Sequence, residues 1–358
     1  MSAMQLLLAS LLPTVASYYA AWNVQWPELC PEKVPSDALT KFGISANEHN
    51  KFNGRAVTTL YNHPGSFTIG NWPCIGSDGK EYNGGLPQLG NLSLHLAQVS
   101  LDVQANFPDP DHDGLIVIDW EEWEPYLQFW GDPKPAARWS FYMNKSYELA
   151  GGSKDLAIAQ WNKTALAFMA ETLKTVVALR PKAKVGYYGM INCGSTPDIG
   201  KRTCPDVIKA RHDALAPLWA AGTALFPSIY SYCRYTNATS TSPSRCIDES
   251  HEEIKIPITL EEVDRVNKLR MPVVPFTWYD LYQQSCAKSP PAGTGHCPLM
   301  LNKTDLHNEF ALAKSAPNVE GIIIWGAHGD VRPGTNDCKA FGEYVETTLG
   351  PLLQSLVQ

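Results

Sequence analysis

The sequence has few charged residues and lacks any long run of lysine or arginine. Charged residues make up 18% of the 358 residues, and 36 Asp and Glu outnumber 29 Lys and Arg, which gives a formal net charge of −7. A protein that binds nucleic acid concentrates positive charge to neutralise phosphates. The composition therefore argues against nucleic acid as a partner.

A long apolar run is also missing after the N-terminal stretch. No later segment reaches the roughly 18–20 apolar residues that a helix needs to cross a bilayer. Residues 6–16 are apolar and end in Thr14-Val15-Ala16, although the usual preceding basic residues are absent. This pattern is typical of a secretory signal peptide, and the alternative is a buried N-terminal segment. We expect a signal peptide over residues 1–16 and one domain over 17–358, secreted rather than lysosomal, monomeric and without a membrane span.

The nine cysteines include no C-x-x-C pair of the kind that binds zinc. Disulfides are the better interpretation, and they agree with secretion. Three pairs are close in sequence: Cys193 with Cys204, Cys233 with Cys246, and Cys286 with Cys297. Sequence alone leaves the connectivity open. Five N-x-S/T sequons agree with the same compartment, at Asn91, Asn144, Asn162, Asn237 and Asn302.

Seven short strand-like segments are present, with helical patterns between several of them. The segments are Tyr18–Val24, Arg55–Tyr61, Leu115–Trp120, Lys184–Tyr188, Ala224–Tyr230, Pro272–Trp278 and Gly321–Trp325. Apolar residues recur at helical spacing in Ser93–Phe107 and Thr164–Arg180. Strands that alternate with helices predict an α/β fold with a parallel sheet. Seven such units in one domain predict a closed or nearly closed barrel, with no convincing sequence repeat.

The stretch Leu115–Trp123 is the most informative for chemistry. Gly114 and four apolar residues precede three carboxylates set among tryptophans. The apolar run predicts a fully buried strand. Asp119 and Glu121 are two residues apart, so on a strand they share one face, whereas Glu122 points the other way. Two carboxylates on one face beside apolar rings can differ in pKa, so that one remains an acid, as breaking a glycosidic bond requires.

Aromatic side chains stand where four later strands end. They are Tyr188, Tyr230, Trp278 and Trp325. The carboxyl ends of barrel strands open onto one face, where active sites are built. A single aromatic at a strand end is more often there for packing. Because the pattern repeats, we predict that these residues meet Asp119 and Glu121 in one cleft.

Two other groups of residues have less specific interpretations. His328 lies just past Trp325 and could shuttle protons, but a lone histidine there is more often a hydrogen-bonded wall residue. Asp109, Asp111 and Asp113 have a spacing that resembles a calcium loop. The later glutamate of an EF-hand-type loop is not at the right offset, and prolines interrupt the segment. We interpret the loop as a solvated turn.

At this point the chain resembles a known family, the hyaluronidases of glycoside hydrolase family 56. The resemblance extends nearly from end to end. It rests on Trp22-Asn23-Val24, Gly84-Gly85-Leu86-Pro87-Gln88, Asp119-Trp120-Glu121-x-Trp123, Gly186-Tyr187-Tyr188-Gly189, Pro227-Ser228-Ile229-Tyr230 and Ile324-Trp325-Gly326. The family implies a distorted TIM-like barrel of about seven strands. Because no cysteine-rich module follows the barrel, the resemblance points to the compact, venom-type architecture.

The same resemblance implies two disulfides, Cys30 with Cys338 and Cys193 with Cys204. Pairing Cys233 with Cys246 and Cys286 with Cys297 follows only from spacing. Cys74 would then remain unpaired or bridge to another chain.

The resemblance also implies a retaining, substrate-assisted mechanism without metal or cofactor. Glu121 would be the acid and base. Asp119, as an anion, would orient the acetamido N–H. Trp120, Trp123 and the Asp119 charge would raise the pKa of Glu121. Tyr230 would hydrogen-bond the acetamido group. Tyr188, Trp325, Tyr61 and Trp123 would line the substrate.

One departure from the family pattern is Glu124, where members usually have arginine after D-W-E-x-W. Hyaluronan is a polyanion, so an acidic protein needs a locally basic groove. Candidates for it are Arg234, Arg245, Arg265 and Lys201-Arg202. The alternative for each of them is a solvated surface charge. We expect a hyaluronan hydrolase. The alternatives are a chondroitin-preferring hydrolase and a catalytically silent glycan-binding protein, with glycosaminoglycan as the partner in each case.

Overall fold

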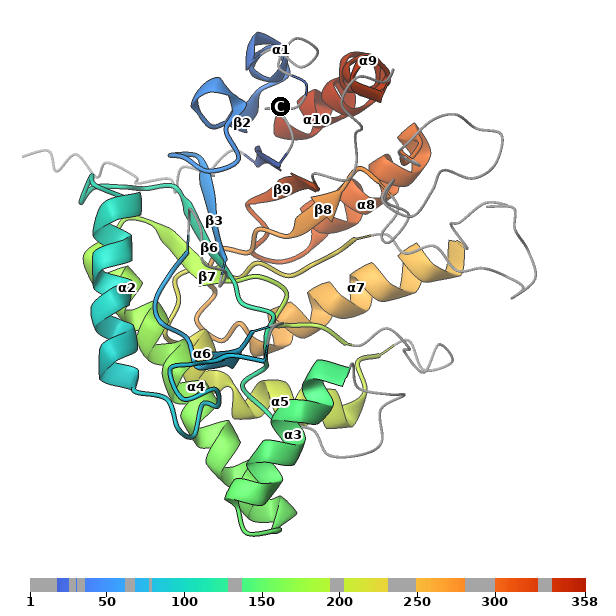
Figure 1. Cartoon of the computed structure of the whole chain (residues 1–358). Helices are drawn as coiled ribbons and strands as arrows, with labels where there is room; N and C mark the ends of the chain where they lie inside the picture. The colour runs from blue at the N-terminus through green and yellow to red at the C-terminus, as the bar shows by residue number, and fades with distance from the viewer. Residues whose placement is uncertain are drawn as a thin grey trace, which may run out of the picture.

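The computed structural model describes residues 18–25, 30, 36–61, 68–76, 79–127, 137–193, 203–230, 249–280, 300–327 and 337–358. Two parallel sheets form the centre of the molecule (Figure 1), with strand orders β2-β1-β9-β8 and β3-β6-β7, and a small antiparallel hairpin joins β4 and β5. The strands are β1 (Tyr19–Val24), β2 (Ile44–Ala46), β3 (Val57–Tyr61), β4 (Cys74–Ile75), β5 (Glu81–Tyr82), β6 (Leu115–Asp119), β7 (Lys184–Tyr187), β8 (Phe276–Trp278) and β9 (Gly321–Gly326).

The two sheets curve into the predicted distorted barrel. The segment predicted as the strand Ala224–Tyr230 connects the sheets through single bridges, Tyr188 with Phe226 on one side and Ser228 with Phe276 on the other. The opposite seam lies between β1 and β3, which are not paired in the sheet order. There the hydroxyl of Thr59 on β3 donates to Asn23 Oδ1 on β1 at 2.7 Å. The α/β, TIM-like prediction is confirmed, and both junctions between the sheets are irregular.

Helices cover the outside of the sheets (Figure 1). They are α1 (Ser36–Lys41), α2 (Leu92–Asn106), α3 (Ala137–Leu149), α4 (Lys154–Leu179), α5 (Asp206–Ala214), α6 (Ala216–Trp219), α7 (Glu249–Val266), α8 (Lys303–Ser315), α9 (Asp337–Tyr344) and α10 (Gly350–Val357), with short 3-10 and π turns at Glu48–Asn50 and Val345–Leu349. Helix α4 starts well before the predicted Thr164, because the side chain of Ser153 caps it by accepting from Leu156 N. No helix in the described ranges is long and apolar enough to span a membrane.

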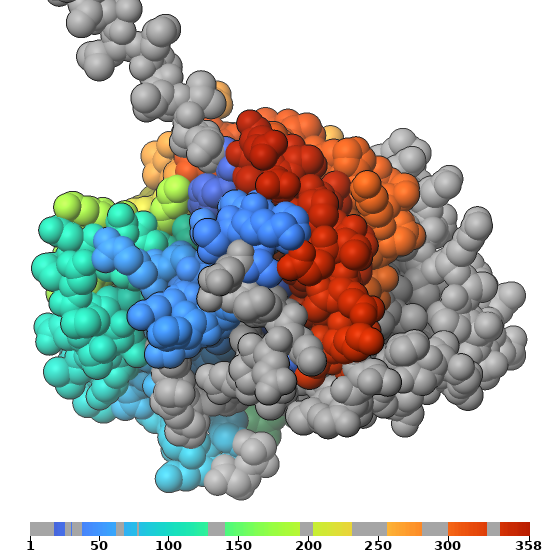
Figure 2. Space-filling view, turned by 90° about the horizontal axis from the view of Figure 1, so that it is seen from above, coloured from blue at the N-terminus to red at the C-terminus, as the bar shows by residue number. Residues whose placement is uncertain are grey.

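The two ends of the described chain lie side by side. Seen from above, the blue segments around α1 and β2 lie against the red helices α9 and α10 (Figure 2). Lys41 of α1 pairs with Glu346 at 2.9 Å. The predicted disulfide between Cys30 and Cys338 forms here, with Cα atoms 5.6 Å apart across 308 residues of sequence.

The second implied disulfide, Cys193 with Cys204, is also present. The proposed pairs Cys233 with Cys246 and Cys286 with Cys297 lie outside the described residues, as do residues 1–16 and His328. Cys74 forms no disulfide with another described cysteine.

The aspartate-rich loop before β6 is an ion-paired surface turn. Arg55 binds Asp109 and Asp113, each at 2.9 Å, and Lys182 binds Asp111 at 2.9 Å. Arg55 therefore joins two of the three carboxylates and Lys182 binds the third, which agrees with the predicted solvated turn.

Candidate active site

The alternation of side chains along β6 determines which residues face the barrel interior. Leu115 and Val117 belong to the apolar cluster that includes residues of β1, β8 and β9. Ile116 and Ile118 belong to the cluster that includes residues of α2 and α4. Because successive side chains on a strand point to opposite faces, Asp119 follows Val117 toward the interior.

The three carboxylates at the end of β6 differ in depth. Asp119 is half-buried, Glu121 is exposed, and Glu122 is only 7% exposed. Trp120, between the first two, belongs to the helix-side cluster with Ile116 and Ile118. An acid that must reach a saccharide has to be accessible, so this arrangement favours Glu121 over the alternative Glu122.

Asp119 is the carboxyl group whose titration the fold changes most clearly. Burial, and then the charge of Glu121, raises the pKa of Asp119 well above its usual value. Its Oδ1 is buried without a hydrogen-bond partner in the described structure. We expected Asp119 to be the fixed anion beside a neutral Glu121. Desolvation of Asp119 opposes its anionic form, so the proposed mechanism needs a group that stabilises this anion.

Three tyrosines surround the carboxylates. Tyr61 ends β3 and is the register partner of Asp119 on β6. Tyr188 follows β7, and its hydroxyl donates to Ser228 Oγ at 3.2 Å. Burial is the main cause that raises the pKa of Tyr61, Tyr188 and Tyr230, and the charge of Asp119 raises the pKa of each further. These shared interactions place all three near Asp119. The strand-end pattern named Tyr188 and Tyr230, whereas Tyr61 was named only from the family resemblance.

Aromatic rings form a wall of the site. Tyr230 stacks on Trp325 with ring centroids 5.8 Å apart and an interplanar angle of 25°. Trp278 packs edge-on against Trp325 at 4.8 Å. Trp325 remains partly accessible, whereas Tyr230 is 4% exposed. The strand-end residues of β8 and β9 therefore build one aromatic wall together with Tyr230.

Trp123 does not lie with this wall. Its side chain is 0% exposed, and its Nε1 donates to Pro73 O at 2.7 Å. The ring packs against Trp72, Trp120 and Trp161. The prediction that Trp123 lines the substrate is therefore wrong in this structure. Trp120 and Trp123 also do not form the apolar surroundings that we expected around Glu121, because both rings pack in the core.

Comparison with known proteins agrees with this arrangement. A family model described as hyaluronidase matches residues 9–358. The chain belongs to the hyaluronidase family. It is therefore a glycoside hydrolase of family 56, and the recognition made from its motifs is confirmed.

Individual relatives span nearly all of the chain. Human hyaluronidase-1 is 30% identical over 347 residues, which cover 92% of this chain and 71% of the relative. A hyaluronidase of the wasp Polistes annularis is 29% identical, covering 94% of this chain and 86% of its own. The crystal structure of bee venom hyaluronidase in complex with a hyaluronic acid tetramer matches with a TM-score of 0.75 and 25% identity, over 96% of this chain and all of that one.

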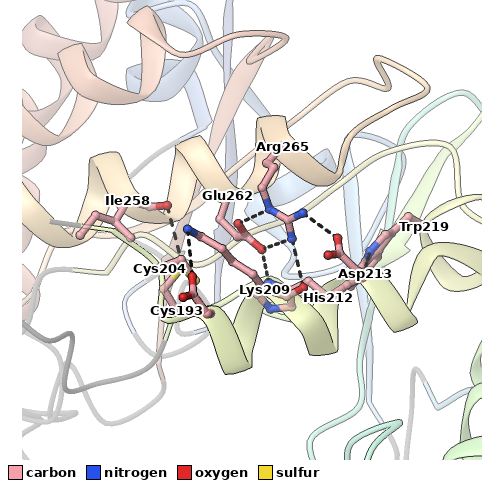
Figure 3. A network of polar contacts seen from close by, with 10 residues as sticks. Cys193, Cys204, Lys209, His212, Asp213, Trp219, Ile258, Glu262 and Arg265 are labelled. Carbon is pink, nitrogen blue, oxygen red and sulfur yellow. Dashed lines mark hydrogen bonds and ion pairs between the residues drawn. A yellow bond between two sulfur atoms is a disulfide. The ribbon is translucent and has the colours of Figure 1, made fainter. Parts of the chain in front are cut away.

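The basic residues expected in the substrate groove of this family member are placed differently or not described. Figure 3 shows Arg265 between Glu262 of its own helix and Asp213 of α5, with contacts of 2.7 and 2.6 Å. Arg265 therefore joins α7 to α5, and its prediction as a groove residue is wrong. Arg234, Arg245 and Lys201-Arg202 lie outside the described residues.

The same network contains the one trio of possible metal ligands in the described part of the chain. Atoms of Cys204, His212 and Glu262 lie within 4.8 Å of one another. The sulfur of Cys204 is bonded to Cys193, and the Glu262 carboxylate binds Arg265 and His212. These donors are already committed, so the trio does not fit a metal ion.

The strand-end pattern missed two polar residues of this site. Gln25 directly follows β1 and donates to Tyr61 Oη at 3.0 Å. Ser228 accepts the hydroxyl proton of Tyr188. The signal was available for both, since each stands at the carboxyl end of a predicted strand. Polar residues without a charge or a large ring were not included among the strand-end candidates.

Proposed function

We propose that this chain hydrolyses internal β-N-acetylhexosaminide bonds of hyaluronan with retention of configuration. The observation that carries the proposal is the pair Asp119 and Glu121 at the end of β6, near Tyr61, Tyr188 and Tyr230. The relatives named hyaluronidase, and the bound hyaluronic acid tetramer of the bee venom enzyme, support the choice of substrate.

In the proposed reaction the substrate supplies the nucleophile. The acetamido carbonyl oxygen attacks the anomeric carbon while the bond to the leaving oxygen breaks. Glu121 donates its proton to that oxygen. Water then attacks the anomeric carbon, reopens the ring formed by the acetamido group and returns a proton to Glu121.

The carboxylate pair holds one proton in this scheme. In the ligand-free enzyme burial favours that proton on Asp119. When the sugar binds, the acetamido N–H next to Asp119 favours its anionic form, so the proton resides on Glu121. The anion then offsets the positive charge that develops on the acetamido group. The titration belongs to the pair and not to either residue alone.

The aromatic groups would position the sugar. Tyr230 would hydrogen-bond the acetamido group, Trp325 would form the wall of the acetyl pocket, and Tyr188 and Tyr61 would contact the reacting sugar and the groove. The wall of Tyr230, Trp278 and Trp325 supports this assignment because its rings are held by one another.

Replacing Glu121 by glutamine tests the proposed acid. Glu121→Gln keeps the size of the side chain but removes the transferable proton, so turnover should fall by at least ~100-fold. Formation of new reducing ends from hyaluronan measures the rate. Binding of hyaluronan oligosaccharides and the melting temperature should change little.

Glu122→Gln is the matched control, because it makes the same change one residue away. It should retain most of the activity. A Glu121→Gln enzyme with more than about a tenth of the wild-type rate would remove Glu121 as the acid.

Chondroitin is the second candidate substrate. Its amino sugar differs from that of hyaluronan at one hydroxyl, and Glu124 stands where the family usually has arginine. The rates at which the enzyme forms new reducing ends from chondroitin and from hyaluronan distinguish a chondroitin-preferring hydrolase from a hyaluronan hydrolase. Binding of either polymer without any cleavage would instead support the silent glycan-binding protein.

Secretion and glycosylation belong to the same proposal. The two described disulfides support an oxidising compartment. Among the sequons, Asn91, Asn144 and Asn302 are exposed, whereas Asn162 is half-buried. Asn237 lies outside the described residues. We therefore expect the three exposed asparagines to be glycosylated more readily than Asn162.

A further inference from the structure

The two halves of the proposed site belong to different sheets. Asp119 on β6 is paired in register with Tyr61 of β3. Trp325 on β9 is paired with Asn23 of β1. On one side the halves are joined by backbone bridges through residues 224–229. On the other side β1 and β3 are not paired with each other in the sheet order, so side chains that cross this seam help to set the distance between the halves there.

Gln25 crosses the seam at the end where the site lies. Its backbone N–H donates to Gly326 O on β9 at 2.8 Å. Its side-chain Nε2 donates to the hydroxyl oxygen of Tyr61 on β3 at 3.0 Å. One residue thus connects the strand that carries Trp325 to the tyrosine beside Asp119.

The chemistry of the Gln25 side chain determines what Tyr61 can do. An amide NH2 group can only donate. The phenol oxygen of Tyr61 therefore accepts from Gln25 Nε2, and its own O–H proton is left for another group. Phe52 stacks on the Tyr61 ring with centroids 6.1 Å apart, which limits tilting of the ring.

We propose that Gln25 is a positioning residue that holds Tyr61 as a hydrogen-bond donor on the Asp119 side of the cleft. In the reaction that O–H stabilises the anionic form of Asp119 and the sugar group that Asp119 orients. The inference rests on the proposed hyaluronan hydrolysis and adds a residue to it. Gln25 acts through Tyr61 and does not contact the reacting atoms.

Replacing Gln25 by glutamate reverses the hydrogen bond without changing the size of the side chain. When the introduced carboxyl group is ionised, it accepts the Tyr61 proton, and the donor toward Asp119 is lost. When that group is protonated, its O–H can still donate to Tyr61. For Gln25→Glu, we expect kcat near the wild-type value at pH 4 and at least about tenfold below it at pH 6, a change set by the ~4.3 pKa of an ordinary glutamate.

Two further variants separate the loss of the hydrogen-bond donor from the general effect of an added negative charge. Gln25→Leu removes one donor and should lower kcat by about three- to tenfold at every pH, with KM little changed. Gln104→Glu adds the same charge at an exposed position of α2 and should keep the wild-type pH profile. In a Tyr61→Phe background both Gln25 substitutions should have no further effect, because no phenol remains to be positioned.

Three results would overturn the inference. The first is a ratio of Gln25→Glu kcat to wild-type kcat that does not change with pH. The second is a Gln25→Leu enzyme with the wild-type kcat. The third is that the two Gln25 substitutions lower kcat in the Tyr61→Phe background as much as they do in the wild type. Wild-type protein that releases no reducing ends from hyaluronan would overturn the proposed function instead. In that case the coupling between Gln25→Leu and Tyr61→Phe in thermal unfolding still tests the bond, and strict additivity would exclude it.

Discussion

At the scale of single residues, depth below the surface separates chemically identical groups. Asp119 and Glu121 are both carboxylates on one strand end, yet one is half-buried and the other exposed. The cost of burying a charge increases with depth, and burial raises the pKa of Asp119 well above its usual value. In the proposed mechanism a bound sugar favours the anionic form of Asp119 and leaves the proton of the pair on Glu121.

Asp119→Asn tests this coupling. It removes the anion that stabilises the developing positive charge, so kcat on hyaluronan should fall at least ~100-fold. It also removes the negative neighbour of Glu121, and a carboxyl group without such a neighbour loses its proton at lower pH. The alkaline limb of the residual kcat profile should therefore move to lower pH. An unchanged limb would contradict a proton shared by the pair.

At the scale of elements, the two faces of β6 have separate tasks. The inward face carries Asp119, and the outward face leads into a layer of tryptophans packed toward α2 and α4. Trp72 stacks on Trp120 with centroids 4.3 Å apart, and His95 of α2 packs edge-on against Trp72 at 4.4 Å. His95 Nε2 also hydrogen-bonds Thr172 of α4 at 2.7 Å. This layer supports the strand end from behind.

His95 should make that layer sensitive to acid. Burial lowers the pKa of His95 from 6.5 to about 4. The unfolded chain thus takes up a proton at a higher pH than the folded one, and stability falls as pH drops from about 6.5 toward 4. Each unit is worth about 1.4 kcal/mol, so His95 alone should lower the free energy of unfolding by about 2 kcal/mol at pH 4.5 relative to pH 7.

Urea unfolding of His95→Gln at both pH values measures this contribution. The variant should be less stable at pH 7, because the packing against Trp72 is lost, but should lose about 2 kcal/mol less on acidification than the wild type does. Equal losses in the two proteins would assign the acid sensitivity to other groups.

At the scale of the whole molecule, a disulfide and an ion pair hold the chain ends together. Cys30 and Cys338 are separated by 308 residues, whereas Cys193 and Cys204 are separated by 11. In the chain-entropy model a bridge stabilises by restricting the unfolded chain, and its effect grows with the logarithm of the loop length. The long bridge should therefore contribute more than the short one.

Paired Cys→Ser variants compare the two bridges. Cys30→Ser with Cys338→Ser should lower the free energy of unfolding by about 3 kcal/mol more than Cys193→Ser with Cys204→Ser, according to the loop-length dependence. Equilibrium unfolding in urea under non-reducing conditions provides the measurement. An equal or reversed order would show that local packing around the bridges outweighs chain entropy.

Much of the fold was predictable because strands and helices leave periodic patterns. The segments around β1, β3, β6, β7 and β9 agree with their predictions within a residue or two, and α2 lies almost where the spacing placed it. The segment Ala224–Tyr230 was predicted as a strand but forms only single bridges. Helix α4 is longer than predicted because a capping serine, and not apolar spacing, determines where it begins.

The local order of residues placed Asp119 and Glu121 two residues apart where β6 ends, set polar and aromatic groups at strand ends, and fixed the motifs that mark the family. These properties depend only on neighbours along the chain. Tertiary structure decided that Trp123 is buried, that Arg265 pairs with α5, that Asp119 is the deeper acid and that Gln25 reaches Tyr61. Each of these depends on which distant segment covers a side chain or donates to it, and no local pattern encodes that partner.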